Sequence, residues 1–568
     1  MSLADDDRLI GTRSRISAAM TGMIRERWGI AAEVDLGPPR DASFGDVSSQ
    51  IALSIAGQLG LPPRDIADDM VAALREQSPS LGLAEVSVGG PGFVNLRFSD
   101  EYLEDFLGLL DARGLCGCLP DVGRGRRAMV EFVSSNPTGP LTVGHCRQAV
   151  LGDTIASLLR HVGWKVDREY YYNDSGRQIE RLAHSLASRY SDIVSDGSTP
   201  FPEDGYQGGY IESWAGDLAC RTRCFRWPDD AAEFASFALE RAMAMIEQDL
   251  DRLGIRFDRF FRETELIPEK TERAIASMRE VATPDGPLAY DDSEGKTWIR
   301  LTALDRPEDR VVRRADGRYT YRLPDIAYHL DKLQRGYDLL VDVFGSDHLD
   351  TSRDVVACVR RLAGPGEVDR KLRVVIHQFV TLMEGGRKVR MSTRAASYVT
   401  LGELIDLAGS ADVTRYLFLT RRAEAHMDFD LDLARKQSDE NPVYYVQYAH
   451  ARISGILRNA REEGIGLPSA PGSVRGLLRH PRERELMRLL QECPFQVEAA
   501  AAALEPHRLT ELMAEIASAF HGFYHSVRVL QAEEGSDTAS ARLLLTSATG
   551  KVLRDLLGMV RVEAPERM

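Results

Sequence analysis

The spacing of apolar residues changes from region to region along this chain and predicts different kinds of structure. Up to about residue 110, helical patterns such as IALSIAGQLG and DIADDMVAALREQ alternate with the extended segment AEVSVGGPGFVNLRF, in which glycines and Pro91 indicate a hairpin. This pattern favours a small α/β module over residues 1–112.

A strand, helix, strand unit follows from Arg126. RAMVEFVSS is typical of a buried strand, NPTGP of a turn, HCRQAVLGDTIASLLRHVG of a helix and KVDREYYY of a second strand. DLLVDVFG and RVVIHQFVTL indicate further strands of the same sheet, whereas residues from about 175 to 265 are helical and rich in charge. We therefore expect a Rossmann-type parallel-sheet domain over residues 120–400, with a helical insertion at about 175–265.

From Leu401 to the end, apolar residues recur at helical spacing and extended patterns are nearly absent. The sequence therefore predicts an all-α bundle over residues 401–568.

Composition narrows the class of protein. A chain of 568 residues with 43% apolar content is large enough for several domains. It has no stretch of the roughly 18–20 apolar residues that a membrane helix needs, and Asp5 to Asp7 lie where a signal peptide would be apolar. We expect a cytoplasmic protein with no membrane contact.

Charge and cysteine spacing exclude some functions. A formal net charge of -15 argues against non-specific coating of nucleic acid, but it leaves room for a local basic face. The seven cysteines lack the paired spacing of a zinc site, so we expect free thiols and no protein-bound metal.

The segment VEFVSSNPTGPLTVGHCRQAVLGD, residues 130–153, carries the strongest chemical signal. It places Gly144 and His145 at the opening of a helix, where free backbone N–H groups attract phosphate. A histidine there can donate to a phosphoryl oxygen as charge builds on it. The alternative for His145 is a helix-capping residue.

This segment resembles the signature of class I aminoacyl-tRNA synthetases, and NPTGPLTVGH is similar to the arginine-specific version. The resemblance implies that His145 and Gly144 serve the ATP phosphates. Thr142 stands where the family has a second histidine, so we expect Thr142 to replace a phosphate donor with a hydroxyl of shorter reach.

A second segment, GGRKVRMSTRAASYVTL at 385–401, resembles the other signature of that family. The resemblance implies a loop that closes over pyrophosphate, with Lys388, Arg390 and Arg394 as its cations and Met391 and Ser392 beside ATP. Arg390 stands where the family has lysine, and Arg394 lies one place late. The alternative is a solvated basic loop.

GSDH follows an apolar strand and indicates the crevice at the carboxyl ends of parallel strands. We expect Gly345, Asp347 and His348 around adenine and ribose. A purely structural turn at the strand end is the alternative.

A pocket for a guanidinium should offer carboxylates and an aromatic face, because the cation is planar and has five donors. By resemblance, Glu131 and Asp325 would hold the guanidinium, Tyr321 would pack against it, and Asn136 would hold the α-amino or carboxylate end. For Asp325 the alternative is a helix N-cap.

The helical tail resembles the anticodon-binding bundle of the same family. Tyr444, Tyr448 and Arg452 interleave rings and charge, which suits stacking on unpaired bases, although tyrosines at helical spacing also suit a core. GPGFVNLRF resembles the module that reads the tRNA elbow, with Asn95 and Phe98 at the matching positions.

Together the resemblances imply an arginine–tRNA ligase that uses ATP with Mg²⁺, L-arginine and tRNA(Arg), and a monomer. Two rival hypotheses remain open at this point. One is a duplicate of the enzyme that binds arginine or tRNA without routine charging, which the departures at Thr142 and Arg390 suggest. The other is a different nucleotidyltransferase on the same fold.

Overall fold

A computed structural model describes residues 8–194, 197, 199–221, 224–389, 399–468, 474–532 and 535–568. The chain divides into two compact units. The first comprises Met1–Pro120, Tyr444–Ala500 and Arg508–Met568, and the second comprises Asp121–Val443 and Ala501–His507. Residues 401–443 therefore belong to the second unit.

A five-stranded parallel sheet forms the centre of the second unit, with strand order β13-β12-β4-β5-β6. Its strands are β4 (Arg127–Glu131), β5 (Lys165–Tyr172), β6 (Arg259–Arg262), β12 (Leu339–Gly345) and β13 (Leu372–His377). Because all five run in one direction, their carboxyl ends meet along a single edge. In this register Glu131 lies opposite Asp342 on one side and Glu169 on the other.

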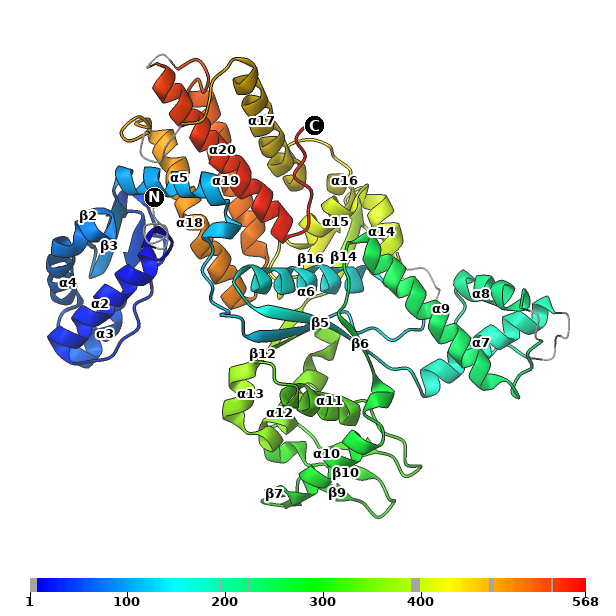
Figure 1. Ribbon diagram of the computed structural model, residues 1–568. Coiled ribbons are helices and arrows are strands. Elements are labelled where there is room, and N and C mark those ends of the chain that lie inside the picture. The colour runs from blue at the N-terminus through cyan, green and yellow to red at the C-terminus, as the bar shows by residue number, and fades with distance from the viewer. Residues whose placement is uncertain are drawn as a thin grey trace. The chain divides into compact units, whose positions relative to one another are not determined.

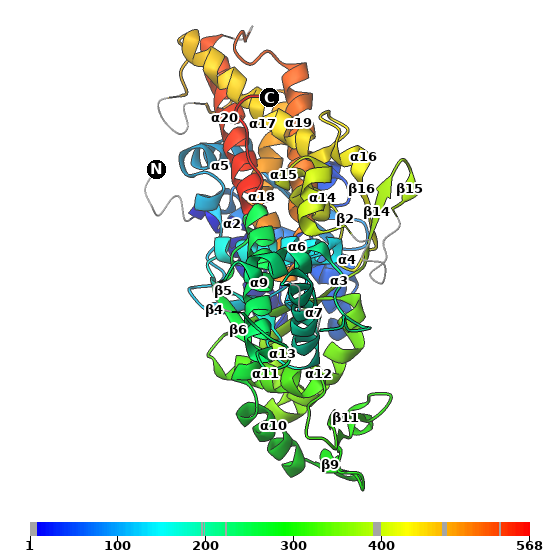
Figure 2. The same cartoon turned by 90° about the vertical axis from the view of Figure 1, so that its right-hand side faces the viewer.

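Helices cover both faces of this sheet (Figures 1 and 2). Helix α6 (Val143–His161) lies on one face, while α11 (Arg322–Gln334), α12 (Leu349–Ala363) and α13 (Pro365–Lys371) lie on the other. Helix α6 packs very closely, because a Cβ on Gly152 would lie 2.2 Å from Cγ of Phe132. The opposite face shares an apolar core with α10 (Glu269–Glu280), which includes Met129, Ile326 and Val355.

The helical insertion forms an arm with its own apolar core. It contains α7 (Arg177–Ile193), α8 (Gly209–Ala219) and α9 (Ala231–Arg252), which pack around Leu186, Trp214 and Phe234. In Figure 1 the arm extends away from the sheet.

Short strands and helices complete the second unit. They are β7 (Ala282–Thr283), β8 (Gly286–Pro287), β9 (Ala289–Asp291), β10 (Thr297–Ile299), β11 (Arg310–Arg313), β14 (Val380–Glu384), β15 (Arg387–Lys388), β16 (Met427–Asp430), α14 (Leu401–Ala408), α15 (Ala411–Phe418) and α16 (Leu431–Ala434). The segment RVVIHQFVTL is thus two strands in different sheets, β13 and β14, and the prediction of one strand was wrong. The chain breaks at Gln378, whose backbone N–H and C=O bind Ala423 and Arg147 instead of a strand.

In the first unit, the amino-terminal module is an antiparallel sheet with order β1-β3-β2 and flanking helices. Its elements are α2 (Thr12–Trp28), β1 (Val47–Ser49), α3 (Ile51–Leu59), α4 (Pro63–Gln77), β2 (Leu83–Gly89), β3 (Phe93–Phe98) and α5 (Asp100–Arg113). The expected hairpin is β2 and β3, which turn at Gly90 to Gly92.

The remaining helices form a bundle of α17 (Pro442–Glu462), α18 (Pro481–Ala503), α19 (His507–Ser526) and α20 (Ser536–Met559). Helix α5 of the module packs on α20: Asp111 accepts hydrogen bonds from Ser547 Oγ at 2.6 Å and Lys551 Nζ at 2.8 Å. The predicted fold class is confirmed: a parallel α/β sheet, an α/β module and an all-α region. Across the described ranges, no helix has the length and apolarity to span a membrane.

Candidate active site

The turn between β4 and α6 lies at the edge of the sheet where the parallel strands have their carboxyl ends. Glu131 is the last residue of β4, and Val133 and Ser134 have left-handed φ values of 67° and 41°. Such values are uncommon for residues with a side chain and typically cost about 1–3 kcal/mol each, so the surrounding packing must enforce them. Here Ser134 Oγ donates to Glu131 Oε1 at 2.8 Å and accepts from the Tyr171 N–H at 3.1 Å.

His145 caps α6 and also has a donor available for a ligand. The backbone N–H of Thr142, the N-cap residue, donates to His145 Nδ1 at 3.1 Å. Burial lowers the pKa of His145 to about 4, an effect that Asp347 opposes and His348 reinforces. The ring is therefore neutral near pH 7, with its proton on Nε2. The capping alternative and the donor hypothesis hold together, because each uses a different nitrogen.

The GSDH turn continues β12 into a short 3-10 helix, Ser346–His348. A Cβ on Gly345 would lie 2.4 Å from Asp347 Oδ1, so only glycine allows the Asp347 side chain to fold back over this position. Asp347 and His348 are exposed, and their side chains approach to 3.6 Å. The charges of Asp347 and His348 act on His145, so the GSDH turn and the start of α6 lie near each other.

His377 is a residue that the sequence analysis missed. It ends β13 directly opposite Gly345 and is 5% exposed. Its Nδ1 donates to the Gln378 carbonyl at 3.2 Å, and Nε2 has no hydrogen-bond partner within the described part of the chain. Burial lowers the pKa of His377 to about 4, so Nε2 offers a lone pair. The signal that could have identified His377 was its position at the end of the strand that lies next to the GSDH strand in the sheet.

The carboxylates of Glu131, Asp325 and Glu263 lie around Tyr171 at this edge of the sheet. Glu131 and Asp325 were predicted from the sequence. The pKa of Asp325 is raised to about 7 by burial; His329 opposes this shift, while the charges of Glu131 and Glu263 add to it. Tyr171 lies among all three: its hydroxyl donates to Glu263 Oε2 at 2.8 Å, and its pKa is raised by burial and by the three carboxylates. Glu263 follows β6 and was missed because nothing in its local pattern distinguishes it.

Asp325 retains some exposed surface, although protein surrounds it closely. No side chain of the described ranges forms a hydrogen bond with its carboxylate. The N-cap alternative for Asp325 is wrong, because α11 begins at Arg322 and its N-cap is Tyr321. The Tyr321 ring is 63% exposed, so it has free surface for a ligand.

Asn136 lies on the turn between β4 and α6. Its Nδ2 donates to Gln178 Oε1 at 2.8 Å, and its Oδ1 accepts from the Asn173 N–H at 3.4 Å. These contacts orient the amide between the strand ends and the start of α7.

The second signature segment is described only in part. Lys388 lies in β15 and is exposed. Arg390, Met391, Ser392 and Arg394 lie outside the described residues. Beyond them, Thr400 forms a β-bridge with Thr142, and the Leu401 N–H donates to the Leu141 carbonyl at 2.7 Å. The chain therefore returns from this segment directly to the start of α6.

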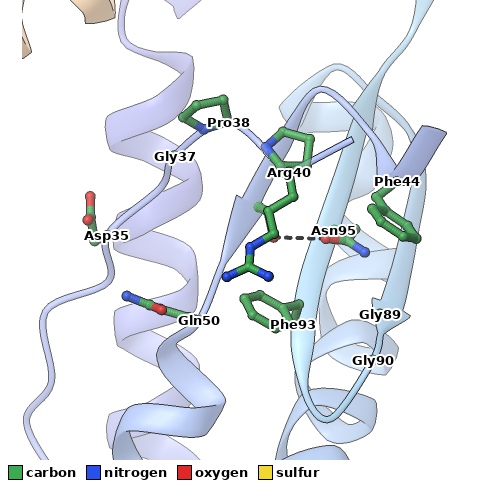
Figure 3. Close-up of a pocket in the computed structure, with 12 residues that line it drawn as sticks. Asp35, Gly37, Pro38, Arg40, Phe44, Gln50, Gly89, Gly90, Phe93 and Asn95 are labelled. Atoms are coloured by element: carbon green, nitrogen blue, oxygen red, sulfur yellow. Dashed lines mark hydrogen bonds between the residues drawn. The ribbon is translucent and has the colours of Figure 1, made fainter. Parts of the chain in front are cut away.

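In the amino-terminal module, a pocket of about 370 Å³ lies beside β3 (Figure 3). Asn95, Phe93 and Arg40 are among the residues that line it. Ser48 Oγ donates to Asn95 Oδ1 at 2.8 Å, which leaves the Asn95 amide NH₂ facing the pocket side of the strand. Phe98, in contrast, is 0% exposed and stacks on Tyr102 with ring centroids 4.6 Å apart. It has no surface with which to touch RNA.

In the bundle, Arg452 lies between two exposed tyrosines. Its Cζ is 4.7 Å from the ring centroid of Tyr448 and 5.4 Å from that of Tyr524, and its Nη2 donates to Tyr448 Oη at 3.0 Å. Tyr444 is half-buried on the same helix. Tyr524, on α19, was not predicted, because the pattern of one helix does not show which residues of another lie beside it.

Comparison with known proteins relates three regions of the chain to described families. The model "Arginyl tRNA synthetase N terminal domain" matches residues 12–98, "tRNA synthetases class I (R), catalytic domain" matches 118–213, and "DALR anticodon binding domain" matches 446–568.

Whole proteins match over nearly the full length. An arginine–tRNA ligase of Salinibacter ruber is 40% identical over 94% of this chain and 96% of its own, and one of Nitratidesulfovibrio vulgaris is 37% identical over 98% and 100%. Among solved structures, the arginyl-tRNA synthetase of Thermus thermophilus covers 98% of this chain and 100% of its own, with a TM-score of 0.76 at 22% identity. That structural likeness concerns the fold.

Proposed function

Because this chain belongs to the arginyl-tRNA synthetase family of class I, we propose that its crevice activates L-arginine with ATP and transfers it to tRNA(Arg). The observation that carries the proposal is the acidic pocket around Tyr171. The charges of Glu131 and Glu263 act on Asp325 there, and all three carboxylates act on Tyr171, whose hydroxyl donates to Glu263 Oε2 at 2.8 Å. Three clustered carboxylates with aromatic rings suit a planar cation with five donors.

In the proposed reaction, the arginine carboxylate attacks the α-phosphate of ATP and pyrophosphate leaves. A hydroxyl of the terminal adenosine of the tRNA then attacks the arginyl carbonyl of the adenylate, which forms an ester and releases AMP and a proton. Positioning and charge stabilisation account for the rate, and no side-chain nucleophile is required. ATP enters as its magnesium complex, so the ion belongs to the substrate.

Each part of the crevice has a role in this scheme. The Nε2–H of His145 and the amide of Gly144 face the phosphates, with Thr142 beside them. Gly345, Asp347 and His348 border the nucleoside, and Lys388, Arg390 and Arg394 meet the leaving pyrophosphate with Met391 and Ser392 near ATP. The described contacts of His145 support its part, since capping fixes the tautomer that leaves Nε2–H free.

Arginine would lie with its guanidinium between Glu131 and Asp325, its planar face toward Tyr321 and its α-amino or carboxylate end at Asn136. We add Glu263 to these arginine-binding residues, because it lies beside Tyr171 and its charge acts on Asp325. Lysine leaves part of such a site unpaired, so we expect strong discrimination against it.

We also propose two contacts with tRNA. The pocket beside Asn95 receives a base of the tRNA elbow, with Phe93 taking the place expected of Phe98. Tyr448, Arg452 and Tyr524, with Tyr444 nearby, offer stacking surfaces to unpaired anticodon bases. A monomer in the cytoplasm remains our expectation, and light scattering on the purified protein would test the oligomeric state.

Two features favour this enzyme over its rivals. Relatives that are 37–40% identical over nearly the whole chain carry the name arginine–tRNA ligase, which speaks against a duplicate that does not charge tRNA. The matched amino-terminal and DALR regions speak against an unrelated nucleotidyltransferase, which has no use for them.

ATP–pyrophosphate exchange with arginine and tRNA(Arg) tests the proposal. We expect exchange that depends on arginine, is absent with lysine, and is lost in Asp325→Ala. Exchange at background level with saturating substrates, or equal exchange with lysine, would overturn it.

A further inference from the structure

Lys332 is a fully buried ammonium directly behind the proposed arginine pocket. It lies on α11, seven residues after Asp325, and its side chain is 0% exposed. Its Nζ donates to Glu131 Oε2 and, at 2.7 Å, to Asp342 Oδ1. Burial alone would lower the pKa of Lys332, but the charges of Asp342 and Glu131 raise it above its ordinary value. The residue is therefore a fixed positive charge between two strands of the sheet.

His329 extends this buried network. His329 Nε2 lies 2.9 Å from Asp342 Oδ2, and its Nδ1 lies 2.7 Å from the backbone carbonyl of Asp325. Both ring nitrogens therefore face oxygen atoms. Helix α11 thus places Lys332 against the carboxylates of Glu131 and Asp342, which lie opposite each other on β4 and β12, and His329 against Asp342.

The network holds Glu131 in one orientation. Lys332 binds Oε2, while Ser134 Oγ donates to Oε1 at 2.8 Å. Burial raises the pKa of Glu131, and the charge of Lys332 opposes this shift more than any other group does. Without that ammonium a carboxyl at this depth would favour its protonated form, which cannot pair with a guanidinium.

Helix α11 carries Asp325 of the pocket and also Lys332, the partner of Glu131 on β4. Asp325 lies two turns before Lys332, and its backbone carbonyl lies 2.7 Å from His329 Nδ1. The contacts therefore run from the Asp325 backbone through His329, Asp342 and Lys332 to Glu131, and they hold the Glu131 carboxylate in place relative to the helix that carries Asp325. Preorganised carboxylates lose less on binding than mobile ones do.

We propose that Lys332 is a positioning residue for arginine recognition, which orients Glu131 and keeps it ionised without touching the substrate. This inference rests on the arginine pocket of the proposed function. If Lys332 served core stability alone, its loss would change the KM values for arginine and for ATP alike. If Lys332 positions Glu131, its loss raises the KM for arginine and leaves the KM for ATP unchanged.

Lys332→Met removes the charge and keeps most of the side-chain volume. We expect the KM for arginine in tRNA-dependent ATP–pyrophosphate exchange to rise about tenfold to a hundredfold, as is common when a partner of a binding group is lost. The KM for ATP and kcat at saturating arginine should change by less than about threefold. Lys332→Arg, which retains a cation, should restore part of the affinity for arginine.

Lys270→Met is the matched control. Lys270, on α10, pairs through its Nζ with Oδ1 of Asp331 at 2.8 Å, and Asp331 lies on α11 beside Lys332. Lys270 is about one-third exposed and does not contact Glu131. Because exposed pairs contribute little, its KM for arginine should stay within about twofold of wild type.

The outcomes separate the two proposals. Wild-type protein with no arginine-dependent exchange overturns the proposed function. A wild type that is active and a folded Lys332→Met with unchanged KM for arginine, or with equal rises for arginine and ATP, overturns the role of Lys332. If Lys332→Met does not fold, Lys332→Met/Asp342→Asn removes one charge of each sign and carries the same expectation. Failure of both to fold assigns Lys332 to the core alone and overturns the inference.

Discussion

At the scale of single residues, Asp325 gives the site a dependence on pH. Burial raises the pKa of its carboxyl to about 7 in the free protein, whereas pairing with a guanidinium requires the ionised form. Arginine binding must therefore displace a proton at and below neutral pH. We expect the KM for arginine to rise about tenfold per pH unit below pH 7 and to level off above about pH 8.

Exchange kinetics between pH 5.5 and 8.5 measure this effect. Asp325→Asn should bind arginine weakly at every pH and show no such slope. If the wild-type KM for arginine is constant from pH 5.5 to 8.5, Asp325 is already ionised and does not take part in this way.

Thr142 stands where the signature that the segment resembles has a second histidine. Its backbone N–H donates to His145 Nδ1, and its Oγ1 lies 3.2 Å from the same nitrogen, so the hydroxyl is engaged with the ring of His145. Thr142→His adds a donor that reaches the phosphates, and a single transition-state donor contributes about a hundredfold or more. We expect kcat for arginine activation to rise at least about tenfold with unchanged KM for arginine. An unchanged kcat in single-turnover measurements would show that the hydroxyl is sufficient.

Some site residues were predictable from local sequence and others were not. His145 and Gly345 were predictable, because each belongs to a short sequence motif that marks the end of an apolar strand. Phe98 was expected to contact tRNA by resemblance, whereas the structure places it, fully buried, on the face of β3 that it shares with Val94 and Leu96. The partner of Glu131 was not predictable, because Lys332 lies 201 residues away and only the packing of α11 on the sheet brings them together.

At the scale of elements, Arg147 joins α6 to the loops on its far side. It is 0% exposed and donates to the carbonyls of Gln378, Arg422 and Ala425 at 2.7, 2.9 and 3.0 Å. The planar fork reaches three carbonyls, one directly after β13 and two in the loop before β16. Burial lowers the pKa of Arg147 to about 10, so it still carries its charge at neutral pH.

Arg147→Lys retains the charge but cannot reach all three carbonyls. Each buried carbonyl left unpaired costs about 1–3 kcal/mol, so we expect the free energy of unfolding of the second unit to fall by about 2–4 kcal/mol. Because Gln378 follows His377, the KM for ATP should rise while the KM for arginine changes little. Urea denaturation and exchange kinetics measure the two effects, and a variant with wild-type stability would contradict this account.

The elements themselves follow from the sequence where their pattern is local. The strand, turn and helix from residue 127 to 161 appear as predicted, because a buried strand and a long helix have distinct periods. The division of RVVIHQFVTL between two sheets was not predictable, since the hydrogen bonds that end β13 come from Arg147 and Ala423, which lie far away in the sequence.

At the scale of the whole molecule, the first unit is assembled from both ends of the chain. Residues 1–120 and most of the residues after 443 form one compact body, which no periodicity in the sequence shows. Their contact is partly polar: the Gly476 N–H donates to Glu104 Oε1 at 3.0 Å, and Arg475 pairs with Asp105 at 2.8 Å. Two regions matched to separate families therefore form one structural unit here.

Asp111 tests that assembly. Its carboxylate accepts from Ser547 and Lys551 of α20, and its side chain is only 16% exposed. Asp111→Ala leaves a partly buried ammonium without its carboxylate, which costs about 1–3 kcal/mol. We expect the first unit to unfold at a lower temperature in calorimetry, and the KM for tRNA to rise because the module and the bundle no longer present their surfaces in fixed positions. Asp69→Ala removes an exposed ion pair with Arg27 in the same unit and should change neither value. A lowered melting temperature with wild-type KM for tRNA would show that each surface binds independently, and that the joining of the two chain ends serves stability alone.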